Sequence, residues 1–381
     1  MGTRQNFVFL GLSLRSSWGN GHATTYRTLL RGLADCGHAI TFLERDVPWY
    51  RDNQDLGIPD YCRLEFYGDL DDLIRRHSRT LDQADAVIVG SYVPDGVALI
   101  DRLFAHVDSL VGFYDMDTPV TLTGLDSRTC PYLSARQIPS FDVYFSFASG
   151  QALTRLEAEY GARMALPLHC MVDPDRCRPT GCEKRWSLGY LGTYAPDRQP
   201  ALERLLLEPA RQLPEHRFVV AGTQYPDGIG WPDNVDYVGH IPPRRHADFY
   251  SSLNYALNLT RADMQAMGWA PSVRLFEAAA CGTAVISDDW EGLDSFFPRD
   301  RAILVAAATG DVVAALQGEP AERIRIADRA RQITLSRHTG RHRAMEFERG
   351  LALALARARA ERSQFPGSIL EGRKHGLRSA V

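Results

Sequence analysis

Short apolar runs recur along the first half of the chain, separated by polar loops and by segments with helical periodicity. The runs fall at 7–14, 39–44, 85–90, 110–114 and 141–147. Continuous apolar runs of this length, bounded by glycine and polar residues, are typical of strands buried on both faces. Their alternation with helical segments predicts an α/β fold with a doubly wound parallel sheet.

The same rhythm restarts in the second half. Apolar runs fall at 187–191, 218–221, 235–238, 256–259, 284–287 and 302–305. Helical patterns are expected at 197–212, 246–253 and 273–280, after 309, and from 321 on. A long amphipathic helix is expected at 341–362. The second half therefore predicts another sheet of the same kind, and the whole chain predicts two Rossmann-like domains.

A segment with three prolines, 166–179, separates the two halves and is typical of a linker. We expect a first domain at 1–168, a linker at 169–184 and a second domain at 185–340. A helix at 341–363 and a mobile tail at 364–381 complete the expected organisation, because the last residues are rich in glycine and basic side chains.

The composition and charge of the chain narrow the classes of function that it can have. A length of 381 residues suits two domains, and the formal charge of −4 gives no electrostatic case for nucleic acid. The seven cysteines form no CxxC pair or zinc spacing, which favours reduced thiols in a cytoplasmic protein. The sequence shows no signal peptide, and no uncharged stretch approaches 18 residues, so no transmembrane segment is expected.

The run SVRLFEAAACGTAVIS, at 272–287, carries the most specific chemistry. It predicts a short helix, a turn at Gly282 and a buried strand. Glu277 is a carboxylate among apolar and small neighbours, and such a charge needs a partner. One interpretation pairs it with Arg274, three residues earlier. In the other interpretation, Glu277 accepts hydrogen bonds from the hydroxyls of a bound sugar, while Arg274 and the helix N-terminus face phosphate.

Two loops of the first half carry further candidates. The loop after the first strand holds Gly19, Asn20, Gly21 and His22, but it lacks the GxGxxG spacing of a dinucleotide site. Its glycines allow a ligand to approach the backbone, whereas His22 is either a helix cap or a reactive group.

The loop after the fourth strand holds Asp115 and Asp117. Either aspartate could serve as a base or bind a substrate hydroxyl, and Asp117 could instead cap the next turn. Aromatic residues near the loops of the first half could stack on a sugar or an aromatic acceptor, or could belong to the core; they are Trp18, Trp49, Tyr50 and Tyr92.

The 272–287 run resembles the nucleotide-binding segment of glycosyltransferases with the two-domain GT-B fold, and most closely their CgeB-like (spore maturation protein) branch. In that family the two domains face a central crevice, and the helix glutamate binds the ribose of the donor. The resemblance implies a donor site at Gly192, Thr193, Arg198, Gly222, Thr223, Gly239, His240, Ile241, Arg261, Ser272, Arg274, Leu275 and Glu277. Many retaining members carry a second glutamate eight residues before the first, where this chain has Trp269.

The resemblance implies a sugar transferase that uses a nucleotide-sugar, a UDP- or dTDP-sugar, as its substrate and needs no separate cofactor. The Asp115–Asp117 pair has the spacing of a metal-binding DxD motif but lies in the acceptor half, so no metal is expected. Asp117 is the first candidate for the base and His22 the second. The sequence leaves the class of acceptor open: it can be a glycan, a lipid, a protein or a small molecule. Two alternatives stay open, a sugar-nucleotide epimerase and a non-catalytic protein that binds nucleotide or glycan.

Overall fold

The computed structural model describes residues 3–364, which divide into two compact units. The first unit contains the residues up to His169 together with those from Gly340 on, and the second contains Cys170–Thr339. Each unit is built around one parallel sheet.

The sheet of the first unit has seven strands in the order β3-β2-β1-β4-β5-β6-β7. Its strands are β1 (Asn6–Gly11), β2 (Ala39–Arg45), β3 (Arg63–Tyr67), β4 (Ala86–Gly90), β5 (Leu110–Asp115), β6 (Val143–Ser146) and β7 (Ala165–Pro167). The helices are α1 (His22–Asp35), α2 (Pro48–Asp52), α3 (Leu70–Asp82), α4 (Gly96–His106), α5 (Thr118–Asp126), the 3₁₀ helix Ala135–Ser140, α6 (Gln151–Ala158) and α15 (Gly340–Gln364). The strand order reverses between β1 and β4, which is where open α/β sheets bind ligands.

The sheet of the second unit has six strands in the order β10-β9-β8-β11-β12-β13, so its order reverses between β8 and β11. Its strands are β8 (Trp186–Leu191), β9 (Phe218–Ala221), β10 (Val235–Val238), β11 (Leu253–Asn258), β12 (Ala284–Ser287) and β13 (Leu304–Val305). The helices are α7 (Gln199–Leu202), α8 (Glu208–Gln212), α9 (His246–Ser251), α10 (Ala262–Met267), α11 (Val273–Ala280), α12 (Leu293–Phe296), α13 (Thr309–Gln317) and α14 (Pro320–Arg337), with a 3₁₀ turn at Pro243–Arg245.

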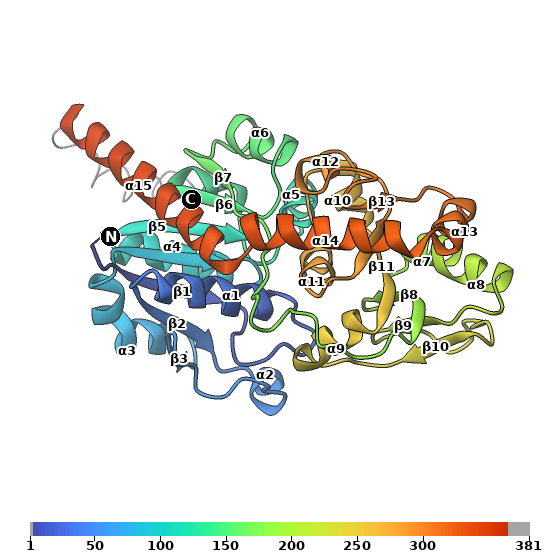
Figure 1. Ribbon diagram of the computed structural model, residues 1–381. Helices are drawn as coiled ribbons and strands as arrows, with labels where there is room; N and C mark the ends of the chain where they lie inside the picture. The colour runs from blue at the N-terminus through green and yellow to red at the C-terminus, as the bar shows by residue number, and fades with distance from the viewer. Residues whose placement is uncertain (1–2, 365–381) are drawn as a thin grey trace. The chain divides into compact units, whose positions relative to one another are not determined.

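The last helix, α15, belongs to the first unit, where it packs beside α1 (Figure 1). The two helices approach closely at a pair of glycines, because a Cβ on Gly32 would lie 2.4 Å from the carbonyl oxygen of Gly340. Phe347 of α15 packs with three aromatic residues of the sheet, Phe7, Phe9 and Phe145. A helix far along the chain thus completes the core of the first unit.

Several elements differ in detail from the sequence expectations. All eleven expected strands are present, but β3 and β7, the two edge strands of the first sheet, were not expected. The helix expected at 197–212 contains a π-helical stretch, Glu203–Leu207, just before Pro209. Proline has no N–H and crowds the preceding turn, which favours this widened geometry.

The proline-rich segment that follows His169 packs on the second unit. Val172 and Cys177 are buried in its core, and Lys184 donates a 2.5 Å hydrogen bond to the carbonyl oxygen of Leu253. The tail expected at 364–381 lies, from 365 on, outside the described residues.

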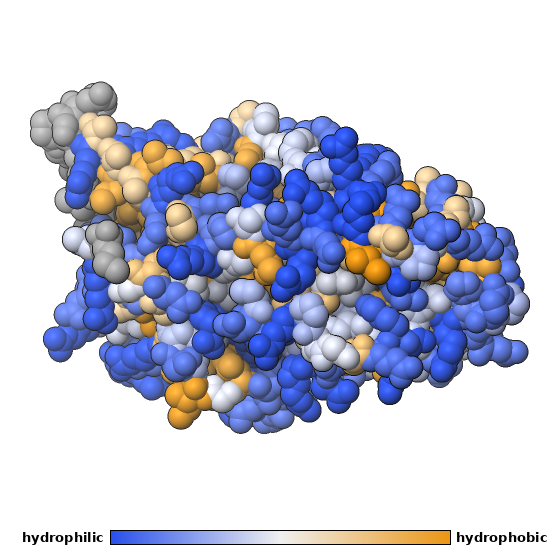
Figure 2. Space-filling view, viewed as in Figure 1, coloured by the Kyte–Doolittle hydropathy of each residue, from blue (hydrophilic) through white to orange (hydrophobic). Residues whose placement is uncertain are grey.

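The surface is mostly hydrophilic on the face shown in Figure 2, where hydrophobic side chains form small separate groups. Within residues 3–364, no helix combines the length and the apolar character that a membrane span requires.

Candidate functional site

Arg274 is held at the end of β8, where the strand order of the second unit reverses. Ser272 caps α11, and its hydroxyl oxygen accepts hydrogen bonds from the backbone N–H of Arg274 at 3.3 Å and from its guanidinium at 3.2 Å. The Arg274 Nε atom also donates to the carbonyl oxygen of Leu191. These contacts turn the side chain away from Glu277, so the ion pair considered from the sequence does not form.

Glu277 contacts His246 instead. The carboxylate is 5% exposed, and its Oε2 lies 3.4 Å from His246 Nδ1. The other ring nitrogen of His246 is 3.2 Å from the carbonyl oxygen of Ile241. Burial alone would lower the pKa of His246, but the charge of Glu277 and these contacts outweigh it and raise the pKa. The pair therefore favours a protonated histidine beside an ionised glutamate.

Three arginines of the second unit form a positive cluster, which we call the arginine cluster: Arg198, Arg261 and Arg274. Arg198 is 6% exposed and donates to the carbonyl oxygen of Thr193 at 2.7 Å. Its Nε atom is buried and has no hydrogen-bond partner among the described residues. Burial is the main cause that lowers the pKa of Arg198, and the positive charges of Arg274 and Arg261 lower this pKa further. Like charges gathered around a buried guanidinium favour an anion as their partner.

Backbone turns at the carboxyl ends of β8, β9 and β10 surround the arginine cluster. Gly222 has a φ of 151°, and a Cβ there would lie 2.0 Å from the carbonyl oxygen of Gly192, so only glycine lets these two turns meet. The N–H of Gly222 donates to the carbonyl oxygen of Gly239 at 3.2 Å, and the N–H of Tyr194 donates to that of Thr223 at 2.9 Å. A small hollow here is lined by Tyr190, Thr193, Tyr194, Arg198 and Tyr225, among others.

The remaining donor-site candidates differ in exposure. His240 and Arg261 are exposed, and Ile241 is half-buried. Leu275 is fully buried, and its N–H donates to the carbonyl oxygen of Ser272 at 3.1 Å. Leu275 therefore packs beneath the site. Trp269, at the position of the missing second glutamate, has a left-handed backbone, and its N–H donates to the carbonyl oxygen of Glu291.

His22 and Asp117 of the first unit form a close pair. His22 is the first residue of α1, and its Nε2 lies 2.9 Å from Asp117 Oδ2. Asp117 stands at the N-cap position of α5, but its side chain makes no capping hydrogen bond. The carboxylate is thus directed to His22 instead of the helix end. Its second oxygen makes no hydrogen bond within residues 3–364, whereas His22 Nδ1 is buried without a partner there.

Asp115 supports Asp117 from below. It is fully buried at the end of β5 and accepts hydrogen bonds from the hydroxyls of Tyr144 at 2.7 Å and Thr121 at 2.8 Å, and from the N–H of Asp117 at 3.1 Å. Burial raises the pKa of Asp115 to about 6, although these hydrogen bonds oppose the rise. Asp115 therefore fixes the turn that carries Asp117 and has no exposed surface for a ligand.

The side chain of Asn20 fixes the conformation of the loop that it forms with Gly19 and Gly21. Asn20 is 3% exposed, and its side chain donates to the carbonyl oxygens of Ser13 and Ser16 at 3.1 and 3.0 Å and accepts from the N–H of His22 at 3.1 Å. The two flanking glycines have no atom within 4 Å of a Cβ built on them. The loop thus has open space at its glycines and a fixed centre.

His246 is the site residue that sequence reasoning missed as a partner of Glu277. It is the first residue of the short helix α9, and its local sequence, RRHADF, has no feature that links it to a residue 31 positions later. No cluster of three or more His, Cys, Asp or Glu side chains that could hold a metal occurs in the part of the chain that the structure describes.

The chain is similar to known proteins both in part of its sequence and in its whole fold. Residues 198–349 match the model of a family described as glycosyl transferase-like. The structure resembles sucrose-phosphate synthase from Thermosynechococcus elongatus, with a TM-score of 0.70 and 13% identity over 93% of this chain and 100% of the other. The chain has the GT-B fold.

Two further GT-B structures contain donor nucleotides. Anabaena HepE, in complex with UDP and glucose, gives a TM-score of 0.68 with 10% identity over 92% of this chain and all of the other. An alpha-glucosyltransferase, in complex with UDP-glucose and DNA containing an abasic site, gives 0.68 with 14% identity over the same shares. No curated protein matches the sequence significantly. The family match and the GT-B fold together indicate a transferase of the glycosyltransferase type.

Proposed function

We propose that the chain transfers a sugar from a nucleoside diphosphate donor to a hydroxyl group of an acceptor. The arginine cluster carries this proposal, because three converging cations at the strand ends need an anion and a diphosphate supplies one. In the proposed role, Arg198, Arg261 and Arg274 bind the diphosphate and stabilise the negative charge that grows on it as the sugar leaves.

Glu277 is proposed to accept hydrogen bonds from the ribose hydroxyls. The carboxylate already has a protonated partner in His246, at 3.4 Å, which is longer than the roughly 2.7–2.9 Å of a strong charge-assisted hydrogen bond. The contact with His246 therefore leaves the glutamate capacity to accept hydrogen bonds. The solved GT-B structures with UDP and UDP-glucose support a UDP-sugar, and a dTDP-sugar is the next choice.

Asp117 is proposed as the base that takes the proton from the acceptor hydroxyl. Its unbonded oxygen could receive that proton, while His22 holds the other oxygen at 2.9 Å. The buried Nδ1 of His22 makes the histidine a positioning residue in this scheme. A base of this kind belongs to a direct displacement, so we expect inversion at the anomeric carbon. Retention, read by proton NMR of the product, would contradict the role of Asp117.

We further propose that transfer needs no metal ion, since the arginine cluster supplies the positive charge that a metal would contribute. The run from Ser272 to Gly282 supports placement in the CgeB-like branch. The seven free cysteines support a cytoplasmic location. The net charge of −4 supports an acceptor other than nucleic acid.

The test is a ligand screen followed by an assay for transfer. Thermal unfolding is measured with UDP, dTDP, GDP, CDP and NAD for the natural protein and for Glu277→Ala, because a ligand that binds the native state raises the midpoint. We expect a shift with one nucleoside diphosphate that is lost in the variant, and release of that diphosphate from its sugar conjugate with acceptor present. A shift with NAD alone, or isomerisation of the donor sugar without transfer, would overturn the proposal.

A further inference from the structure

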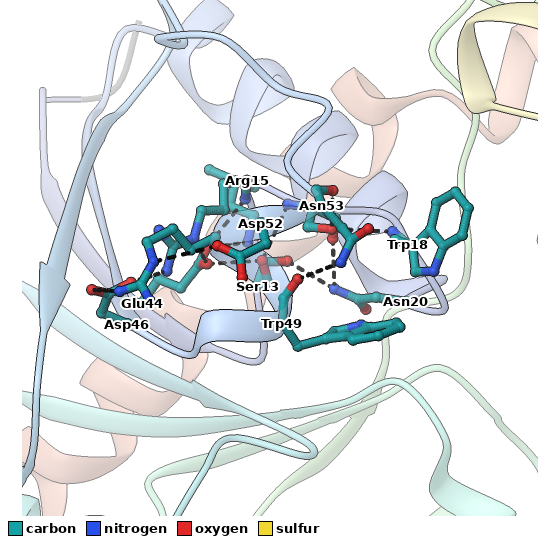
Figure 3. Close-up of polar contacts among 12 residues, drawn as sticks. Ser13, Arg15, Trp18, Asn20, Glu44, Asp46, Trp49, Asp52 and Asn53 are labelled. Carbon is teal, nitrogen blue, oxygen red and sulfur yellow. Dashed lines mark hydrogen bonds and ion pairs between the residues drawn. The ribbon is translucent and has the colours of Figure 1, made fainter.

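Two tryptophans of the first unit lie at the surface. The side chain of Trp18 is 41% exposed and that of Trp49 is 54% exposed. Trp18 lies in the loop after β1, and Trp49 lies in α2, which follows β2. In Figure 3 both indole rings extend from the same polar network towards one side, with the side chain of Asn20 between them. We call this pair the tryptophan platform.

Three hydrogen bonds join the backbones of the two tryptophans. The N–H of Trp18 donates to the hydroxyl oxygen of Ser16 at 3.3 Å, and that hydroxyl donates to the carbonyl oxygen of Asn53 at 2.7 Å. The Asn53 side chain then donates to the carbonyl oxygen of Trp49 at 2.9 Å. The backbones that carry the two indoles are therefore linked by short polar side chains.

A buried ion pair fixes the loop that carries Trp18. Glu44 is fully buried and accepts hydrogen bonds from the Ser13 hydroxyl at 2.8 Å, from the backbone N–H of Leu14 at 2.6 Å and from the guanidinium of Arg15 at 2.7 Å. Arg15 also donates to Asp46 at 2.6 Å. Charges withdrawn from water are costly, so such a network stabilises one loop conformation more than it stabilises the fold. The platform is thus preorganised, which reduces the entropy that binding must overcome.

The platform is connected to the proposed base. Asn20 bonds to the backbone of Ser16 through its amide and to the N–H of His22 through its carbonyl oxygen. Trp18 is therefore held within the same rigid loop that positions His22. Trp18, Trp49 and Asp117 each follow a parallel strand of the first sheet, so a group bound on the platform lies at the same edge of that sheet as the His22–Asp117 pair.

The chemistry around the platform favours an uncharged, hydroxyl-rich ligand. The face of an indole carries negative potential, and it attracts the weakly positive C–H groups on one side of a sugar ring. Polar side chains beside the platform carry both signs of charge, Arg51 paired with Asp46 and the exposed Asp52 next to them. Such a rim provides donors and acceptors for the hydroxyls of a sugar ring.

We propose that the tryptophan platform is an acceptor subsite and that the acceptor is a carbohydrate chain. One sugar ring of the acceptor stacks on Trp18 and a neighbouring ring stacks on Trp49, and a hydroxyl of that chain reaches Asp117. The proposal deepens the proposed function and rests on it, because a platform beside the base has a catalytic meaning only in a transferase. The carbohydrate can be a free oligosaccharide or the sugar part of a glycolipid.

The test follows tryptophan fluorescence and heat of binding of the full chain in the presence of UDP. The probes are soluble tetrasaccharides of glucose, xylose, galactose and N-acetylglucosamine. We expect at least one of them to shift the emission. Trp18→Leu and Trp49→Leu should each weaken its binding by about tenfold or more. Trp49→Phe, which keeps an aromatic face, should retain most of the affinity, and Ile324→Ala, at a 53% exposed position of α14, serves as the matched control.

The outcomes separate the two proposals. If UDP binds but no tetrasaccharide changes the signal, or if the leucine variants bind as the natural protein does, the platform proposal is wrong and the donor site stands. If a tetrasaccharide binds and UDP does not, the sugar-binding site stands, but its role as an acceptor subsite falls with the proposed function. A further arm uses the same tetrasaccharide linked to a lipid in detergent micelles, beside the lipid alone. Binding of the free or linked sugar supports the platform, whereas equal binding of the lipid alone overturns it.

Discussion

Replacing Glu277 by glutamine removes its charge while keeping its size. The side chain is 5% exposed and lies 3.4 Å from His246, so the variant keeps the packing of α11 but loses a strong acceptor. Ser272 still caps the helix, and Arg274 still bonds to the end of β8. The change therefore probes the carboxylate itself.

The expected magnitude follows from the hydrogen bonds that the carboxylate would make. A hydrogen bond to a charged group contributes about 1.5–3 kcal/mol, and a bond to a neutral amide oxygen contributes about 1 kcal/mol. If the ribose donates two hydroxyls, the loss on going to glutamine is about 1–4 kcal/mol. That corresponds to about a 5- to 700-fold rise in the Kd for UDP.

A double-mutant cycle separates ribose recognition from indirect effects. Calorimetry measures the binding of UDP and of its 2′,3′-dideoxy analogue to the natural protein and to Glu277→Gln. Because the analogue lacks the hydroxyls, the variant should bind it as tightly as the natural protein does, and the coupling energy should equal the whole loss seen with UDP. Glu319→Gln, at an exposed position of the same unit, is the control. An equal loss of affinity for both ligands would refute the ribose assignment and point to a disturbed His246.

Other predictions concern charge, proton transfer and metal. The pKa of His246 is raised in the folded protein, so its contribution to stability is complete below its unfolded pKa of about 6.5 and is lost as the pH rises through the folded value. The difference in the free energy of unfolding between the natural protein and Glu277→Gln, measured by urea unfolding, should therefore be largest at pH 5.5 and should narrow by pH 8.5. Asp117→Asn should lower kcat about 100-fold or more with unchanged UDP affinity, and adding His22→Gln should cost little further if the two act as one unit. Arg274→Lys should weaken UDP about tenfold but leave uridine unaffected, since only UDP carries the diphosphate; equal losses would contradict a phosphate role. Transfer should survive a chelator, and loss that Mn²⁺ or Mg²⁺ restores would show that a metal is required.

The sequence predicted the fold well because parallel strands buried on both faces leave continuous apolar runs. The two missed strands lack that signal. In β3, RLEFY, four of the five residues are partly or fully exposed, and β7 has three residues and ends in Pro167. Edge strands bury less surface, and their composition approaches that of loops.

The sequence indicated candidate residues for the site, but it did not indicate which of them pair with one another. His22 and Asp117 are 95 positions apart, and they meet because β1 and β5 flank β4 in the first sheet. Glu277 contacts His246 only because α9 and α11 pack together in the second unit. Arg274 was one of two interpretations for the partner of Glu277, because neighbouring turns of a helix are visible in the local sequence. The carbonyl oxygen of Leu191, which holds Arg274, is 83 positions away.

The place of α15 in the first unit has a consequence for how the protein is made. The first sheet is encoded before residue 170, but the core around Phe7, Phe9 and Phe145 is closed by Phe347. A ribosome must therefore complete nearly the whole chain before the first unit can finish folding. The second unit is continuous in sequence and is free of this delay, so it can reach its native state first. A nascent chain stalled before residue 340 would expose the aromatic face of the first unit, and such surfaces are what chaperones recognise.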